Sequence, residues 1–163
     1  MMDPTSLKLM GDFRNTYLPG DSRRSVLEVG SRNERGSFRP IFEGWDYTGL
    51  DIVFGPNVDL RVHDPYRWTE LADDSFDAVI SGHTFEHIEF VWLTMAEIKR
   101  VMRPGGYCCI IAPARGIRHR FPIDCWRIQE RGMIALGKWA ELRTVTTVKA
   151  DDRWATVMYV GRK

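Results

Sequence analysis

The sequence has few cysteines, no long apolar stretch and no excess of charge of either sign. Its three cysteines, two of them adjacent at Cys108 and Cys109, suit neither a disulfide framework nor a zinc knuckle, so we expect packing residues or inert thiols. The apolar stretches are too short to span a bilayer, and the N-terminus lacks the apolar core of a signal peptide, which predicts a cytoplasmic protein. Lys and Arg number 23 against 22 Asp and Glu, and this balance gives no support to nucleic-acid binding.

A glycine motif for dinucleotides is also missing. Gly30 closes an apolar stretch, but the next two glycine positions of a G-x-G-x-x-G motif hold Arg32 and Arg35. A pyrophosphate needs bare backbone N–H groups at a helix start, and those glycines provide them. We therefore expect a nucleoside-type ligand without a pyrophosphate.

The order of apolar segments predicts the fold class. A chain of 163 residues is expected to form one domain. Strand and helix patterns alternate before two β-rich segments follow each other, which indicates an α/β fold with a doubly wound, mostly parallel sheet and a C-terminal antiparallel hairpin. Strands are expected at 25–29, 45–52, 58–60, 76–81, 107–112, 142–148 and 154–160, and helices at 38–42, 91–102 and 133–140.

Acidic residues lie at or near the expected strand ends, where ligands of open α/β sheets bind. Asp51 lies 21 residues beyond Gly30, close to the offset of about 20 at which an acidic residue meets a ribose. Asp64 suits an adenine amine, and Glu28 suits an ammonium or a sulfonium. Each also has a structural alternative: a strand-end turn for Asp51, an Asx-turn before proline for Asp64, and a solvent-facing strand position for Glu28.

Five segments in this order resemble the motifs of a known family. They are 26–30 (VLEVG), 47–51 (YTGLD), 75–80 (SFDAVI), 85–88 (FEHI) and 101–106 (VMRPGG). As a set, they are similar to the successive motifs of class I S-adenosylmethionine-dependent methyltransferases, in the methyltransferase type 11 group. The resemblance covers about 26–136, and the Arg-Pro-Gly-Gly turn is its most distinctive member.

The resemblance implies a Rossmann-like, seven-stranded sheet, methyl transfer, and S-adenosylmethionine as cofactor. By similarity, Glu28 and Gly30 line the methionine end, Asp51 holds the ribose hydroxyls, and Asp64 meets adenine. Gly82 and His83 would close over the cofactor. The expected cofactor-binding set is Glu28, Gly30, Ser31, Arg32, Asp51, Ile52, Asp64, Pro65, Tyr66, Gly82 and His83.

Two features depart from the family pattern. Arg32 stands where the first motif usually has its second glycine, and the N-terminal region before the first strand is short. We expect an arm or lid at 1–24, a cofactor-binding core at 25–140 and a hairpin at 141–163. A partner subunit, as in a homodimer, or a large substrate would then close the pocket. These departures also leave an alternative open, a catalytically degenerate methyltransferase fold that acts as a binding or scaffolding protein.

A methyl acceptor that carries a hydroxyl needs a general base, and the candidates are His87, His119 and Asp124. The segment 119–127 (HRFPIDCWR) resembles a pattern of type 11 members that accompany sugar and polysaccharide biosynthesis. This resemblance favours a small-molecule or glycan hydroxyl as acceptor. As a structural alternative, His119 is a surface histidine.

The segment 83–87 (HTFEH) raises the question of a metal ion. It matches the H-x-x-E-H signature of zinc peptidases, but His83 is expected at a strand end and not on a helix, which disfavours a peptidase. It also resembles the metal-binding element of small-RNA 2′-O-methyltransferases, although no basic surface supports an RNA substrate. Whether a metal is bound stays open; if one is, the expected ligands are His83, Glu86, His87 and His119.

Overall fold

The structure, a computed structural model, describes residues 3–20, 23–33, 36–119 and 122–163. Its centre is a seven-stranded sheet in the order β3-β2-β1-β4-β5-β7-β6. The strands are β1 (Ser25–Val29), β2 (Asp46–Asp51), β3 (Leu60–Arg61), β4 (Phe76–Gly82), β5 (Met102–Ala112), β6 (Arg143–Lys149) and β7 (Val157–Arg162). The helices are α1 (Pro4–Tyr17), α2 (Val91–Val101) and α3 (Glu130–Trp139), with 3-10 turns η1 (Arg39–Phe42) and η2 (Phe85–His87).

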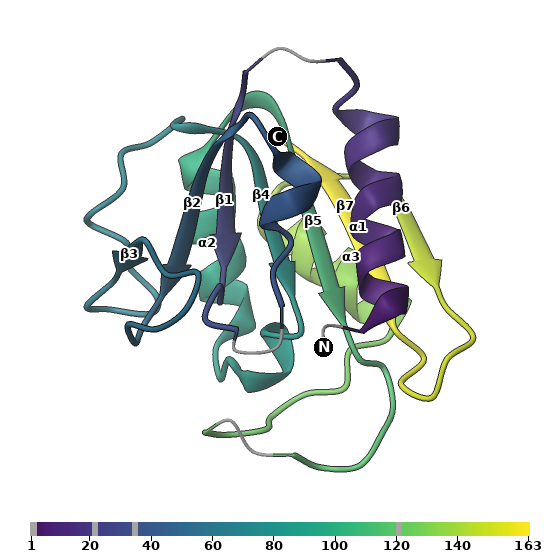
Figure 1. The fold of residues 1–163 in the computed structure, drawn as a ribbon. Helices are drawn as coiled ribbons and strands as arrows, with labels where there is room; N and C mark the ends of the chain where they lie inside the picture. The colour runs from purple at the N-terminus through teal and green to yellow at the C-terminus, as the bar shows by residue number, and fades with distance from the viewer. Residues whose placement is uncertain (1–2, 21–22, 34–35, 120–121) are drawn as a thin grey trace.

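The sheet confirms the predicted fold class. Strands β1 to β5 pair in parallel, whereas β7 pairs antiparallel with both β5 and β6. The strand order reverses between β1 and β4, and ligands of such sheets bind beyond the strand ends at this point. In Figure 1 the parallel strands point toward one edge, where the start of α1 and the long connection between β5 and α3 also lie.

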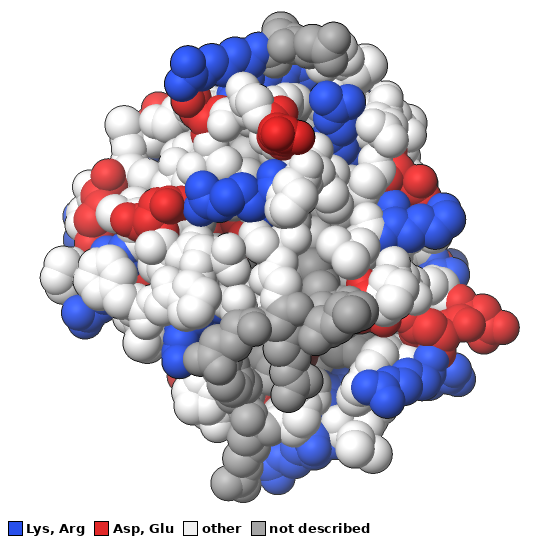
Figure 2. Space-filling model, in the orientation of Figure 1, with Lys and Arg blue, Asp and Glu red and all other residues white. Residues whose placement is uncertain are grey.

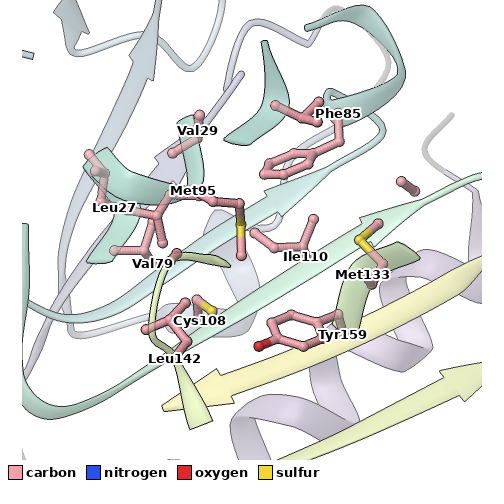
Figure 3. Close-up of a cluster of buried hydrophobic side chains, with 14 of the residues drawn as sticks. Leu27, Val29, Val79, Phe85, Met95, Cys108, Ile110, Met133, Leu142 and Tyr159 are labelled. Atoms are coloured by element: carbon pink, nitrogen blue, oxygen red, sulfur yellow. The ribbon is translucent and has the colours of Figure 1, made fainter. Parts of the chain in front are cut away.

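Apolar side chains fill both faces of the sheet. Because side chains alternate along a strand, Leu27 and Val29 of β1 pack on one face and Val26 packs on the other. The first cluster includes residues of α2 and α3, and Figure 3 shows part of it around Met95, Ile110 and Tyr159. The second includes residues of α1 and η1. Burial on both faces explains why β5 reads as a nearly continuous apolar run.

The N-terminal region forms a helix, although a short arm was expected there. Asp3 is the N-cap of α1 and accepts a hydrogen bond from the Ser6 backbone N–H (2.9 Å), while Pro4 occupies the first turn. Helix starts favour Asp at the N-cap and Pro in the first turn, so these two residues are signals for the start of α1. Leu9, Met10 and Phe13 bury the helix against the sheet. Residues 1–2 and 21–22 of the expected arm lie outside the described residues.

The cysteine prediction is confirmed for the adjacent pair. Cys108 and Cys109 are fully buried in β5, and burial raises the pKa of the Cys108 thiol to about 12. Such a thiol is a poor nucleophile because it is not ionised at neutral pH. Cys125, by contrast, is an exposed free thiol.

On the face shown in Figure 2, Lys and Arg side chains are interspersed with Asp and Glu and do not gather into one basic area. Among the described residues, no helix is long and apolar enough to cross a membrane.

The contact of α3 with β7 depends on a glycine. A β-carbon at Gly137 of α3 would lie 1.9 Å from Tyr159 Oη and 2.6 Å from Tyr159 Cζ. Tyr159 is fully buried and cannot move aside without disturbing the cluster around it. The helix therefore lies against the tyrosine because Gly137 has no side chain.

We predict that Gly137→Ala lowers the free energy of unfolding by about 1–3 kcal/mol, the usual cost of overpacking a core. Gly11→Ala in α1 is the matched control, because a β-carbon there would meet nothing within 4 Å. That change should raise the stability by up to about 1 kcal/mol through helix propensity. Urea unfolding of both variants measures the effects; equal stability of Gly137→Ala and the parent protein would contradict the packing described.

Candidate functional site

A pocket of about 420 Å³ opens at the carboxyl ends of β1, β2 and β4. Its volume lies within the range of about 300–1,000 Å³ that is typical of small-molecule sites. The pocket is at the reversal of strand order, as expected for this sheet. The predicted site residues among its lining are Gly30, Arg32, Asp51, Ile52, Pro65, Tyr66, His83 and His87.

The turn after β1 is tight and requires glycine. Gly30 has a φ of +74°, and a β-carbon there would lie 2.2 Å from two side-chain atoms of Thr84. The N–H groups of Gly30 and Ser31 both donate to the carbonyl of Leu50, at 2.9 and 3.0 Å. The turn is thus fixed to β2 on one side and to the end of β4 on the other.

Asp51 presents a carboxylate that the backbone holds in place. Its Oδ2 accepts from the N–H of Arg32 at 3.0 Å, and its Oδ1 accepts from the N–H groups of Ile52 and Val53 at 2.7 and 3.2 Å. A carboxylate has about four lone-pair sites, so accepting capacity remains for a ligand. Three backbone N–H groups occupy these sites, so the arrangement suits a hydroxyl group of a ribose.

Arg32 and Ser31 follow Gly30 and have different positions. Arg32 lines the pocket, and its side chain packs over Gly55, whose β-carbon would come within 2.7 Å of Arg32 Nε. Ser31 is buried between β1 and β2, close to Gly49, and does not belong to the pocket lining. The residue in the place of the family's second glycine is therefore a wall of the pocket.

Apolar side chains flank the outer part of the pocket. Ile52 and Val53 line it and remain about half exposed, and Pro65 and Tyr66 line it as well. Asp64 is exposed and accepts a hydrogen bond from the Tyr66 N–H at 2.8 Å, which is the Asx-turn weighed as its structural alternative. These apolar side chains suit a flat ring such as a nucleobase, and Asp64 stands next to them in sequence.

Glu28 and Gly82 do not line the pocket. Glu28 is only 3% exposed, which overturns the solvent-facing alternative, and it accepts a hydrogen bond from the Tyr47 hydroxyl at 2.6 Å. Burial raises the pKa of Glu28 to about 7, although the hydrogen bond from Tyr47 opposes this shift. A β-carbon at Gly82 would lie 2.4 Å from the ring of Phe38, so this glycine lets η1 pack on β4.

His83 connects α1 to the pocket. It lies at the end of β4 with a φ of +54°, a conformation that is uncommon outside glycine. Its Nε2 is 2.8 Å from Ser6 Oγ, and its Nδ1 is 3.5 Å from Glu86 Oε1. Burial alone would lower the pKa of His83, but the Glu86 carboxylate and the more distant Asp3 and Asp152 raise it above its usual value.

Turn η2 and the loop before α3 bring the other predicted residues together. His87 Nδ1 donates to the carbonyl of Ile123 at 2.5 Å, and the ring of His119 contacts that of His87 edge-to-face with centroids 4.9 Å apart. Asp124 accepts from the backbone N–H of His119 at 2.7 Å and pairs with Arg127 at 2.6 Å. The Arg127 guanidinium holds the pKa of Asp124 well below its usual range.

Several residues that complete the site carry no signal in the sequence. Ser6, Thr84 and Ile123 contact His83, Gly30 and His87 through side-chain or backbone atoms. Their chemistry is ordinary, and their positions depend on tertiary contacts. Residues 120 and 121 of the segment 119–127 lie outside the described residues.

The sequence matches the family model of the methyltransferase domain over residues 27–110, which covers the strands and turns of this pocket. The chain belongs to the class I S-adenosylmethionine-dependent methyltransferases. The cofactor is S-adenosylmethionine.

Individual relatives of this methyltransferase agree on the fold and differ in reaction. The structure of 1,6-didemethyltoxoflavin-N1-methyltransferase from Burkholderia thailandensis, with 1,6-didemethyltoxoflavin and S-adenosylhomocysteine bound, superposes with a TM-score of 0.75 at 19% identity, covering 99% of this chain and 79% of that one. The [4+2]-cyclase SpnF superposes with a TM-score of 0.72 at 15% identity, covering 97% and 80%.

A curated relative is the ubiquinone/menaquinone biosynthesis C-methyltransferase UbiE of Desulfotalea psychrophila (strain LSv54 / DSM 12343). It is 31% identical over 70 residues, which are 41% of this methyltransferase and 28% of the relative. The match therefore spans less than a third of that protein. Nitrogen and carbon methylation and a cyclisation all occur among these relatives, so they do not fix the acceptor.

We predict that Glu28 makes the stability of this methyltransferase depend on pH. Its pKa is about 7 in the folded state against a usual 4.5, so the folded state favours the protonated form. The resulting stability is present below pH 4.5 and is lost as the pH rises to about 7. Glu28→Gln should remove this slope and be more stable at pH 8 by on the order of 1–3 kcal/mol.

Tyr47→Phe is the matched variant, because it removes the hydrogen bond that favours ionised Glu28. It should extend the loss of stability to higher pH. Urea unfolding between pH 4 and 9 measures all three proteins. A Glu28→Gln profile with the same slope as the parent protein would show that Glu28 is not the group responsible.

Proposed function

We propose that this protein transfers a methyl group from S-adenosylmethionine to a hydroxyl group of a small-molecule or glycan acceptor. One observation carries the proposal: two sets of residues line the same pocket. Gly30 and Asp51 offer the features that a nucleoside needs, and His87 brings an imidazole to the same cavity. Methyl transfer to oxygen requires both a cofactor site and a place for the hydroxyl proton.

Bound S-adenosylmethionine supplies a methyl group on a positively charged sulfur. Gly30 leaves room for the backbone to approach the ligand closely, and Asp51 accepts a hydrogen bond from a ribose hydroxyl with the lone pair that its backbone partners leave. Ile52, Pro65 and Tyr66 pack on the adenine ring, and Asp64 receives its amine at the rim. We assign a structural role to Glu28 and Gly82, because Glu28 is hydrogen-bonded to Tyr47 and Gly82 packs against Phe38.

His87 is the residue best oriented to receive the acceptor proton. A carbonyl oxygen only accepts hydrogen bonds, so the contact with Ile123 puts the proton of neutral His87 on Nδ1. Its Nε2 then carries a lone pair. As the acceptor oxygen gains the methyl group, its proton passes to this lone pair. Asp124 positions His119 and is a poor base, because its pairing with Arg127 keeps it ionised.

Exposed side chains on the loop before α3 favour an extended acceptor such as a glycan. His119 remains 42% exposed at its side chain, and the side of Trp126 is also open to solvent. The Trp126 ring is held by a hydrogen bond from its Nε1 to the carbonyl of Ile88, at 2.8 Å. Trp126 lines a separate groove with Trp92 and Trp139, and exposed aromatic rings of this kind suit the apolar face of a sugar ring. A homodimer, a cytoplasmic location and the division at residues 24 and 140 stay predictions of the sequence.

We predict that Asp51→Ala weakens the binding of S-adenosylhomocysteine by about 10–100-fold, since it removes charge-assisted hydrogen bonds to the ribose. Calorimetric titration measures the change. Asp12→Ala is the control, because Asp12 forms an exposed ion pair with Lys8 on α1. Thermal midpoints confirm that both variants fold. Unchanged affinity of Asp51→Ala would refute the ribose assignment.

A second prediction concerns turnover. In a panel of sugar, polyol and phenol acceptors, we expect methyl transfer to at least one hydroxyl, and His87→Gln should lower kcat by about 10²–10⁴-fold. Binding of S-adenosylhomocysteine should stay within about threefold of the parent protein. His63→Gln is the control, because His63 pairs with Glu70 on the surface. Binding of the cofactor without turnover on any acceptor would favour the degenerate, scaffolding alternative.

A further inference from the structure

Three side chains next to the pocket could ligate one metal ion. Glu86 and His87 of η2 and His119 of the following loop each offer an atom, and these atoms all lie within 4.8 Å of one another. Ligands at about 2.0–2.2 Å from a single ion are roughly 3–4 Å apart, so small side-chain rotations would complete the site. His119 has room to rotate because it is partly exposed.

The carboxylate of Glu86 is an unusual group for a folded interior. Glu86 is 1% exposed, and neither of its side-chain oxygens accepts a hydrogen bond from a described residue. The nearest imidazole nitrogens are His83 Nδ1 at 3.5 Å and His87 Nε2 at 3.9 Å. A buried carboxylate without donors is costly unless a cation compensates it.

His87 is oriented as a metal-binding histidine is. His87 donates its Nδ1 proton to the carbonyl of Ile123, which leaves the Nε2 lone pair on the side of Glu86. Metal-binding histidines usually donate their other ring N–H in this way. His119 Nδ1 lies 3.9 Å from Asp124 Oδ2, and Asp124 is itself held by Arg127. The His87 ring thus has a hydrogen-bonded outer partner, whereas the His119 ring lies near Asp124 and Arg127 and keeps room to rotate.

His83 lies beside Glu86, with its Nδ1 3.5 Å from Glu86 Oε1, but it is not one of the three converging residues. Its Nε2 is engaged with Ser6 Oγ at 2.8 Å, and its atoms are not part of the group whose ligand atoms converge. Of the four residues considered from the sequence, the geometry therefore selects three.

We propose that Glu86, His87 and His119 bind one divalent transition-metal ion that holds the acceptor hydroxyl beside the cofactor. Two imidazoles and one carboxylate suit Zn²⁺ and neighbouring first-row ions, and three protein ligands leave a coordination position open. His87 lines the pocket, so the proposed ion lies beside the place of the acceptor.

This inference rests on the proposed function and changes how the proton is handled. A hydroxyl bound to the ion has a lowered pKa and releases its proton to water. The acceptor oxygen then forms a bond to the methyl carbon while the bond from that carbon to sulfur breaks, and the ion keeps its charge. His87 Nε2 coordinates the ion in this case and does not take the proton.

The first test is calorimetric titration of chelator-treated protein with Zn²⁺ and, separately, Co²⁺, together with thermal midpoints. We expect one ion per chain and a raised midpoint. Loss of a residue that only hydrogen-bonds to a metal ligand weakens metal binding by about 10–100-fold. His119→Ala removes a ligand itself and should weaken metal binding by more than this. Because the His119 side chain is partly exposed, His119→Ala should leave the packing of the core unchanged. Glu86→Gln is the second variant and should also lose the metal-induced shift.

His63→Gln is the matched control, since it removes a surface histidine outside the cluster and should keep both the affinity and the shift. Absence of saturable binding, or equal affinity in His119→Ala and the parent protein, would overturn the site. Binding of S-adenosylhomocysteine to the metal-free protein is measured in parallel. Its presence without metal binding would refute the metal site alone and leave the proposed function standing.

The second test concerns the role of the ion in turnover. With an acceptor found in the panel, removal of the metal should abolish methylation, and added Zn²⁺ or Co²⁺ should restore it. Full turnover by metal-free protein would overturn the role proposed for the ion and leave His87 as the proton acceptor.

Discussion

The site depends on the close approach of two backbone turns where the strand order reverses. The turn after β1 and the end of β4 meet at Gly30 and Thr84, where any side chain on Gly30 would collide with the threonine. Through Gly30 and Ser31 the first turn is bonded to β2 and hence placed beside Asp51. Thr84 leads directly into η2. One contact therefore fixes the distance between the part of the pocket that suits a nucleoside and the part that carries the imidazoles.

Features that depend on local sequence were predictable. The parallel strands and the hairpin follow from apolar segments and their succession, and Asp51 follows from its offset to Gly30 because both end neighbouring strands. The Arg-Pro-Gly-Gly segment was expected to be only a turn. In the structure it lies within β5, because Met102 already pairs with Phe76 across a register shift. Pairing to a distant strand decides such boundaries, and no local pattern contains it.

Side-chain direction was the part that the sequence could not settle. Alternation along β1 separates Glu28 from Leu27 and Val29, but it does not say which face carries the ligand. Tyr47 of the neighbouring strand lies on the same face as Glu28 and donates a hydrogen bond to its carboxylate. Helix α1 is a similar case, since its contact with His83 through Ser6 brings the N-terminal region to the edge of the pocket by tertiary packing.

Two buried carboxylates show how differently the fold treats the same group. Glu28 accepts a hydrogen bond from the Tyr47 hydroxyl, and its raised pKa lets it become neutral. The cost of burying this carboxyl group is therefore compensated within the folded chain. The Glu86 carboxylate accepts no hydrogen bond from the described residues, and its nearest partner is His83 Nδ1 at 3.5 Å, although the carbonyl of the same residue receives the N–H groups of Cys125 and Trp126. The backbone around Glu86 is thus firmly ordered while its carboxylate is left unsatisfied. Unsatisfied buried polar groups in otherwise ordered surroundings are typical of functional sites, where a bound species completes the set. The contrast explains why we assign a structural role to the Glu28 carboxylate and a functional role to the Glu86 carboxylate.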